Sequence, residues 1–176
     1  MKIAAILSGL AALVLAACAP VEASPQSSGP VSITLTRTMC FGFCPDYSVT
    51  ITGDGQVTYV GRGFVNVMGE QHATIPVSDV QALLSRFDAV NFEQLHDEYR
   101  ANITDIPTQT ITLERNGRRK TLVDYGGTAV GMPEAVNEIE AEIDRVAHTE
   151  RWILRDGEPV RTPRPAPPQT PTRSKG

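Results

Sequence analysis

Hydrophobic and polar residues alternate along several stretches of the chain with the period of two that half-buried strands show. The first such stretch, VSITLTR, begins at Val31. The stretch DYSVTITGDGQVTYVG then predicts a hairpin. A three-residue loop at 53–55 sets Ile51 opposite Val57, which keeps apolar side chains on one face of both strands. Such a loop needs a left-handed residue, and Gly55 supplies it.

Further strands are expected after this hairpin. The region 65–75 has a weaker strand pattern. The stretch TQTITLERNGRRKTLVDYGG contains the dipeptide Asn116-Gly117, which is the strongest short signal for a hairpin turn. A two-residue turn there pairs Ile111 with Leu122 and predicts a second antiparallel pair of strands.

The stretch PVSDVQALLSRFDAVNF changes to the helical period. Its apolar residues form one stripe, which comprises Val80, Leu83, Leu84 and Phe87. Ser78 is expected to cap the N-terminus of this helix, because Gln81 three residues later completes a capping box.

The stretch PEAVNEIEAEIDRVAHTERWI predicts a second helix with Pro133 in its first position. The side expected to be buried comprises Ala135, Val136, Ile139, Ile143 and Val146. The acidic residues of this helix are expected on a solvated face, not at a cation site; they are Glu138, Glu140, Glu142 and Asp144. Trp152, just after the helix, is expected to fill a core or edge position.

The order of these elements predicts the fold class. Hairpins join antiparallel neighbours, so the sheet should be mainly antiparallel. We expect an α+β domain over residues 31–155, with a sheet of about five to six strands and two helices packed on one face.

The N-terminus has the layout of an export signal. Lys2 precedes a short apolar run, IAAILSGLAALVLAA, that is too short to be a comfortable membrane span. The stretch LAAC resembles the cleavage box of bacterial lipoproteins, which implies a signal peptide at 1–17 and a lipid-modified Cys18. Ala19 follows Cys18 where an inner-membrane sorting signal has Asp, so the expected address is the outer membrane, facing the periplasm. An ordinary signal peptide with an incidental cysteine is the alternative.

Charge and composition separate the domain from its flanks. All 20 acidic residues lie between Glu22 and Glu158, together with 11 basic residues, and this acidic balance argues against binding of nucleic acid. Residues 18–30 are rich in Ser, Pro and Gly and are expected to form a flexible tether. Residues 156–176 are basic and rich in proline, and are expected to be extended and disordered. This tail is either a solvated extension or a ligand for a groove or an anionic envelope polymer.

The sequence TMCFGFCPDY places Cys40 and Cys44 in the mature chain as its two remaining cysteines, if Cys18 is lipidated. An even pair in an oxidising compartment favours a structural disulfide. A thiol-redox pair or a copper or zinc site is the alternative, since CFGFCP has the spacing of the copper-binding, thiol-handling Sco-type proteins. In those proteins the motif opens a helix, which lowers a thiol pKa, whereas DYSVTIT is expected to be a strand.

The stretch CFGFCPDYSVTITGDGQVTYVG resembles a bacterial family known as a domain of unknown function. Its pattern is a cysteine, a short loop with aromatic residues and glycine, Cys-Pro, a tyrosine and a hairpin that contains glycine. The resemblance covers roughly 32–124, and members often look like exported proteins or lipoproteins. It implies no activity, substrate or catalytic residue.

These observations favour a non-enzymatic envelope lipoprotein that is anchored to the membrane by lipid and binds a periplasmic protein or envelope polymer. Phe41, Phe43 and Tyr47 are the candidate contact residues, because aromatic side chains on a rigid loop make good anchors. We expect no catalytic residue, no metal site and no cofactor. The alternative function is thiol-redox or copper handling through Cys40 and Cys44.

Overall fold

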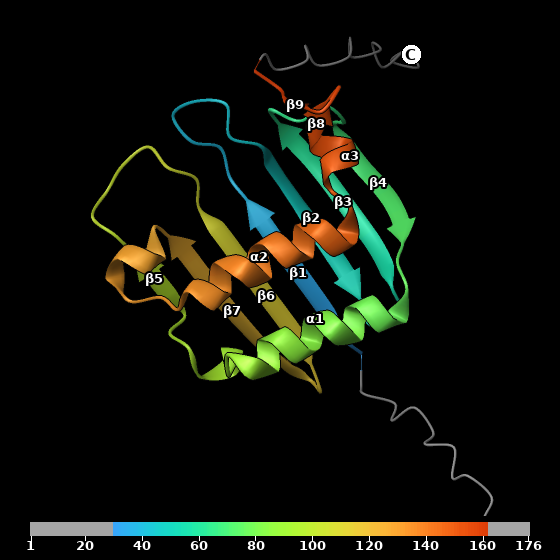
Figure 1. Cartoon of the computed structure of the whole chain (residues 1–176), viewed down its shortest axis with the longest axis vertical. Helices are drawn as coiled ribbons and strands as arrows, with labels where there is room; N and C mark the ends of the chain where they lie inside the picture. The colour runs from blue at the N-terminus through green and yellow to red at the C-terminus, as the bar shows by residue number, and fades with distance from the viewer. Residues whose placement is uncertain (1–29, 162–176) are drawn as a thin grey trace, which may run out of the picture.

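Seven strands form one sheet in the computed structural model of the chain, which describes residues 30–161 (Figure 1). From one edge to the other they are β4 (Gly69–Thr74), β3 (Gln56–Gly63), β2 (Asp46–Thr52), β1 (Ser32–Arg37), β6 (Gln109–Arg115), β7 (Arg118–Tyr125) and β5 (Glu98–Arg100). All neighbours are antiparallel except β5 and β7, which are parallel. The short β5 accounts for the sheet being wider than expected.

Two helices cover one face of this sheet, α1 (Val77–Ala89) and α2 (Glu134–Ala147) (Figure 1). A short helix α3 (Glu150–Ile153) and a ribbon of β8 (Leu154–Arg155) and β9 (Glu158–Pro159) follow α2. The remaining helical turns are η1 (Phe92–Gln94) and η2 (Gly127–Val130). The expected α+β class, with a mainly antiparallel sheet and two main helices on one face, is confirmed.

Both hairpins have the predicted register. Ile51 lies opposite Val57, and Gly55 has a φ of 85°. Ile111 lies opposite Leu122 across the Asn116-Gly117 turn. The physical reason is the alternation itself, because a shift of one residue would move every apolar side chain of a strand to the solvent face.

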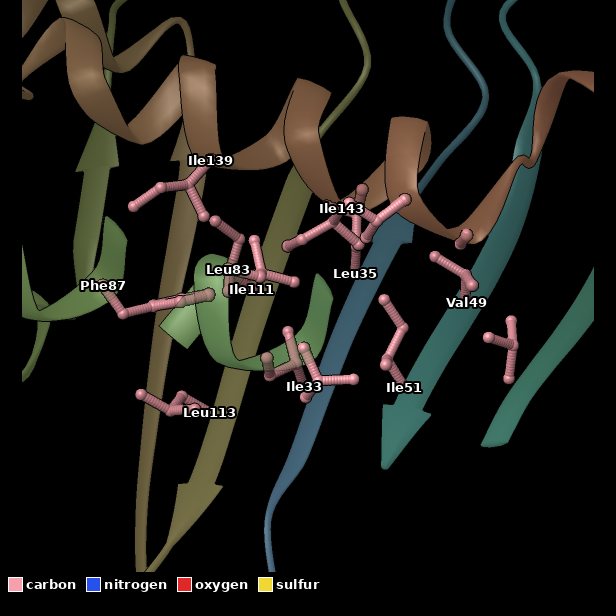
Figure 2. Packing of buried hydrophobic residues seen from close by; sticks show 14 of the residues in the cluster. Ile33, Leu35, Val49, Ile51, Leu83, Phe87, Ile111, Leu113, Ile139 and Ile143 are labelled. Atoms are coloured by element: carbon pink, nitrogen blue, oxygen red, sulfur yellow. The ribbon is translucent and has the colours of Figure 1, made fainter. Parts of the chain in front are cut away.

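The core lies between the sheet and the two helices (Figure 2). The predicted stripe of α1 is buried in full: Val80, Leu83, Leu84 and Phe87. From α2, Ile139 and Ile143 face the strand residues Leu35 and Ile111 across the layer (Figure 2). Trp152 is also buried and stacks on Tyr59, with the ring centroids 4.8 Å apart.

The predicted cap of α1 is wrong. The helix begins at Val77 and its N-cap residue is Pro76, so Ser78 already lies within the first turn and its side chain makes no capping hydrogen bond. The reason is that Pro76, with φ at −58° and ψ at 137°, enters the helix directly from an extended backbone. In the same way, Pro133 is the N-cap of α2 rather than its first residue.

The sheet has two different ends. At the turn end lie the tight turns at 53–55 and 116–117, together with Pro30, where the described chain starts. At the loop end lie the longer connections 38–45, 64–68 and 101–108. The cysteine motif is in the first of these connections, between β1 and β2.

Candidate functional site: the disulfide loop and its buried support

Exposed apolar side chains gather at the loop end. Among the described residues, seven large hydrophobic side chains are exposed, and Val77 is the one at the opposite end of the sheet. The other six are Met39, Phe41, Phe43, Met68, Ile103 and Val130. We call the four on loops 38–45 and 101–108 the apolar rim: Met39, Phe41, Phe43 and Ile103. Phe41 is 89% exposed, which is unusual for so large an apolar side chain.

A disulfide fixes the shape of residues 38–45, which we call the disulfide loop. Cys40 and Cys44 are bonded, with their Cα atoms 5.5 Å apart. Gly42, at the bend between them, donates its N–H to the Cys40 carbonyl oxygen at 2.9 Å. Five residues therefore form a closed ring that turns the side chains of Phe41 and Phe43 outward.

The disulfide loop is also held by its neighbour, loop 101–108. The Thr38 N–H donates to the carbonyl oxygen of Thr108 at 3.0 Å, and the Thr38 hydroxyl accepts the Thr108 N–H at 3.0 Å. Farther out, the Phe41 N–H donates to the Asp105 carbonyl oxygen at 3.3 Å. These bonds place Phe41 without using its side chain, which stays free to contact something else.

Phe43 has partners on its own side of the loop. Its ring meets Phe64 edge to face, with centroids 6.0 Å apart. The guanidinium of Arg161 lies 5.8 Å from the centre of the Phe43 ring. The last described residue of the chain thus lies beside the disulfide loop.

The base of the disulfide loop is tied to α2 by charge. Arg37, directly before the loop, and Tyr47, the second residue after it, are paired across β1 and β2. Arg37 donates from Nε to Asp144 Oδ2 at 3.0 Å, and the Tyr47 hydroxyl donates to Asp144 Oδ1 at 2.6 Å. Thr149 donates to the same Oδ1 at 2.8 Å. Asp144 is thus a common acceptor for both strands and for the end of α2.

Glu140 lies one helical turn before Asp144 and is buried, with 4% of the residue exposed. Its Oε2 lies 3.5 Å from an Arg37 nitrogen, while its Oε1 is buried with no hydrogen-bond partner. Burial raises the pKa of Glu140 to about 7; Arg37 opposes this effect, and the charges of Asp124 and Asp144 reinforce it. Burial, more than Asp144, also raises the pKa of Tyr47, so that its hydroxyl remains a donor at every physiological pH.

The solvated face predicted for α2 is therefore wrong at Glu140, and the side chains of Glu142 and Asp144 are only 13% and 21% exposed. Glu138 is exposed as expected, but Glu140 faces the sheet. The signal was present in the sequence: Glu140 follows Val136 by four residues and precedes Ile143 by three, so it falls on the apolar stripe. Arg37 had a comparable signal, since it continues the alternation of Ile33 and Leu35 toward the helix side.

The structure separates the three predicted contact residues. Phe41 and Phe43 are exposed on the disulfide loop, whereas Tyr47 is 1% exposed and belongs to the core beside Tyr59. Tyr47 is the first apolar position of β2 on the helix side, so its ring lies in the core and not at the apolar rim. Its role is to hold the base of the loop. The predicted positions of Cys18, the signal peptide and most of the tether and tail lie outside the described residues.

Other chemistry-bearing groups in the described part of the chain do not form a comparable site. Within residues 30–161 no group of three or more His, Cys, Asp and Glu side chains is arranged to hold a metal ion. A hollow of about 300 Å³ lies beside the second hairpin, next to Arg115 and Arg119. These cations already have partners, because Arg115 pairs with Asp88 and Glu93, and Arg119 pairs with Glu114.

These features define a class: a two-layer α+β domain that presents a disulfide-closed aromatic loop at one end of an antiparallel sheet. More particularly, the chain belongs to the family described as "Domain of unknown function (DUF6438)", whose sequence pattern matches residues 31–147. The match includes the disulfide loop and both helices that support it. A search of curated proteins finds no match. No helix within residues 30–161 is long and apolar enough to cross a membrane.

Proposed function

We propose that this protein is a non-enzymatic envelope lipoprotein whose disulfide loop binds a protein or polymer in the periplasm. The observation that carries the proposal is the exposure of Phe41, at 89%. The loop that carries it is restrained by the disulfide, by loop 101–108 and by helix α2. A large aromatic side chain placed in water by rigid backbone is typical of a contact residue in an interface. The lipid anchor rests on the LAAC sequence that ends at Cys18.

Rigidity favours binding by this loop. The disulfide, the bonds to loop 101–108 and the Asp144 contacts all restrict its conformations before any partner arrives. A loop that is already ordered loses little conformational entropy on binding. The free energy gained when a partner buries the exposed apolar side chains can then contribute to affinity, because little of it is needed to order the loop.

The position at which the described chain begins is compatible with an anchor. Pro30 lies at the turn end, where β1 begins (Figure 1), and the loops that carry the apolar rim lie at the opposite end of the sheet. A flexible tether from a lipidated Cys18 would join the domain at its turn end. The apolar rim, at the other end of the sheet, would then remain accessible to a partner.

Site-specific photocrosslinking tests the binding surface. A photoreactive phenylalanine analogue is placed at Phe41 in the producing bacterium, and the same analogue is placed at Val77 as a control. Val77 is a matched position because it is 49% exposed and apolar, but lies at the other end of the sheet. We expect a discrete adduct from position 41 that is absent from position 77 and is lost in a Phe43→Ala background. The same adducts from both positions, or none from position 41, would contradict the proposal.

Intact mass of protein isolated from membranes tests the anchor and the sulfur chemistry together. We expect an N-terminal Cys18 carrying acyl groups, and no alkylation of Cys40 or Cys44 unless the sample is first reduced. An unlipidated chain would remove the lipoprotein assignment. Free thiols that alkylate without reduction, or retained copper, would favour the redox or metal-handling alternative.

A further inference from the structure

We propose that the proline-rich segment 162–171 of the same chain occupies the apolar rim, and that the rim is therefore a site for extended peptides that carry proline and arginine. This inference rests on the proposed function, because it names the chemistry that the disulfide loop accepts. Its first support is where the described chain ends. Val160 is 3% exposed, and the next residue, Arg161, lies with its guanidinium 5.8 Å from the centre of the Phe43 ring.

The fold determines where the described chain ends. The Trp152 and Ile153 carbonyl oxygens accept the N–H groups of Val67 and Asn66, which ties the segment after α2 to the loop that carries Phe64. The β8–β9 ribbon then returns the chain to Val160. The described chain consequently ends with the Arg161 guanidinium beside the Phe43 ring, and ten further residues, at about 3 Å each in extended form, are long enough to cross the loop.

The chemistry of the two partners is complementary. Proline-rich segments are usually bound by aromatic side chains that line a groove, and their extended form costs little entropy to fix. Phe41 and Phe43 provide such rings, and Arg161 already shows the cation–aromatic contact that Arg164 could repeat. Loop 101–108 places the exposed Asp105 beside Phe41, which provides a carboxylate for a basic segment.

The prolines in the sequence of segment 162–171 have a spacing that suits binding through one side of an extended peptide. The polyproline II conformation repeats every three residues. With that period Pro165, Pro168 and Pro171 fall on one side, and Arg161 and Arg164 fall together on another. Pro163 and Pro167 are off the proline stripe, so they provide a matched control that has proline in the same segment.

The test uses the mature chain, residues 18–176, with Cys18→Ser so that it can be studied without a membrane, and with 4-fluorophenylalanine in place of Phe41. Fluorine NMR is recorded with increasing amounts of a soluble gadolinium chelate, which broadens signals from exposed groups. We expect at least twofold stronger broadening in P165G/P168G/P171G than in the unchanged chain. The control P163G/P167G should change the broadening by much less. Thermal unfolding should be the same in all three, because the substitutions lie outside the described fold.

The other outcomes separate this inference from the proposed function. Equal broadening in all variants would show that the segment leaves the rim open. Protection that increases with protein concentration would indicate a second copy of the chain as the occupant. If the broadening is equal but the photocrosslink from position 41 persists, this inference fails and the proposed function stands. If the segment protects Phe41 but no crosslinked partner exists, the intramolecular contact stands and the proposed function fails.

Discussion

The Tyr47 hydroxyl donates a hydrogen bond of 2.6 Å to Asp144, which joins the start of β2, just after the disulfide loop, to the C-terminal half of α2. The two residues are 97 positions apart in the sequence. Asp144 also accepts from Arg37, on the other side of the loop. One carboxylate on a helix thus sets the position of both ends of the exposed loop.

Removal of the Tyr47 hydroxyl should destabilise the protein. In Tyr47→Phe the ring still fills its place, but Asp144 loses a neutral donor in a half-buried setting. We expect a loss of about 2 kcal/mol in the free energy of unfolding, measured by urea denaturation. The matched control is Tyr59→Phe, because the Tyr59 hydroxyl donates to the uncharged Val67 carbonyl oxygen at 3.3 Å. Its cost should be about 1 kcal/mol or less, and equal costs would argue against the role of Asp144.

Glu140 should make the protein less stable as the pH rises. Its ordinary pKa is 4.5, and burial raises it to about 7 in the folded state. The folded protein therefore binds more protons than the unfolded chain between these values, so stability falls as pH increases from about 4.5 to 7. The full difference corresponds to about 3 kcal/mol.

Glu140→Gln should flatten this pH dependence and raise the free energy of unfolding at pH 8. Denaturation between pH 5 and 8 provides the measurement. Glu138→Gln serves as the control, since Glu138 is exposed on the same helix and the substitution removes the same charge. A variant of Glu140 with an unchanged pH profile would show that another group causes the dependence.

Loss of the disulfide should cost stability but preserve the fold. The ring closes over five residues, for which chain entropy predicts about 2 kcal/mol. The double variant Cys40→Ser, Cys44→Ser should therefore unfold at lower denaturant concentration with an unchanged circular dichroism spectrum. Addition of a reductant should bring the unchanged protein to the same midpoint and leave the variant unaffected. A variant that fails to fold would show that the loop organises the sheet.

Gly61 should not tolerate a side chain, although Gly63 in the same strand should. A Cβ at Gly61 would lie 2.2 Å from the Val67 carbonyl oxygen and 2.7 Å from the Tyr59 hydroxyl oxygen. At Gly63 the nearest atom would be Asp46 Cβ at 3.7 Å, an ordinary contact. We expect Gly61→Ala to cost about 2–3 kcal/mol and Gly63→Ala to cost much less, as measured by thermal unfolding. Similar values for the two variants would contradict the observed packing of loop 64–68.

The sequence predicted those features that depend on neighbouring residues. Alternation gave the strands and the register at Ile51 and Val57, and the Asn116-Gly117 turn placed the second hairpin correctly. The helical stripe of α1 was also correct, because it repeats within one element. The parallel strand β5 was not predicted, since a three-residue strand has too short a pattern to detect.

The features of the candidate site also fall into two groups, those that local sequence determines and those that the tertiary structure decides. The sequence by itself determined the cysteine pair, the aromatic residues between the cysteines and the strands on either side, because each is encoded by a local pattern. The tertiary structure decided that Phe41 is exposed while Tyr47 is buried, and that Arg37, Glu140 and Asp144 meet beneath the loop. These contacts join residues about a hundred positions apart, and such proximity arises only when α2 packs across β1 and β2.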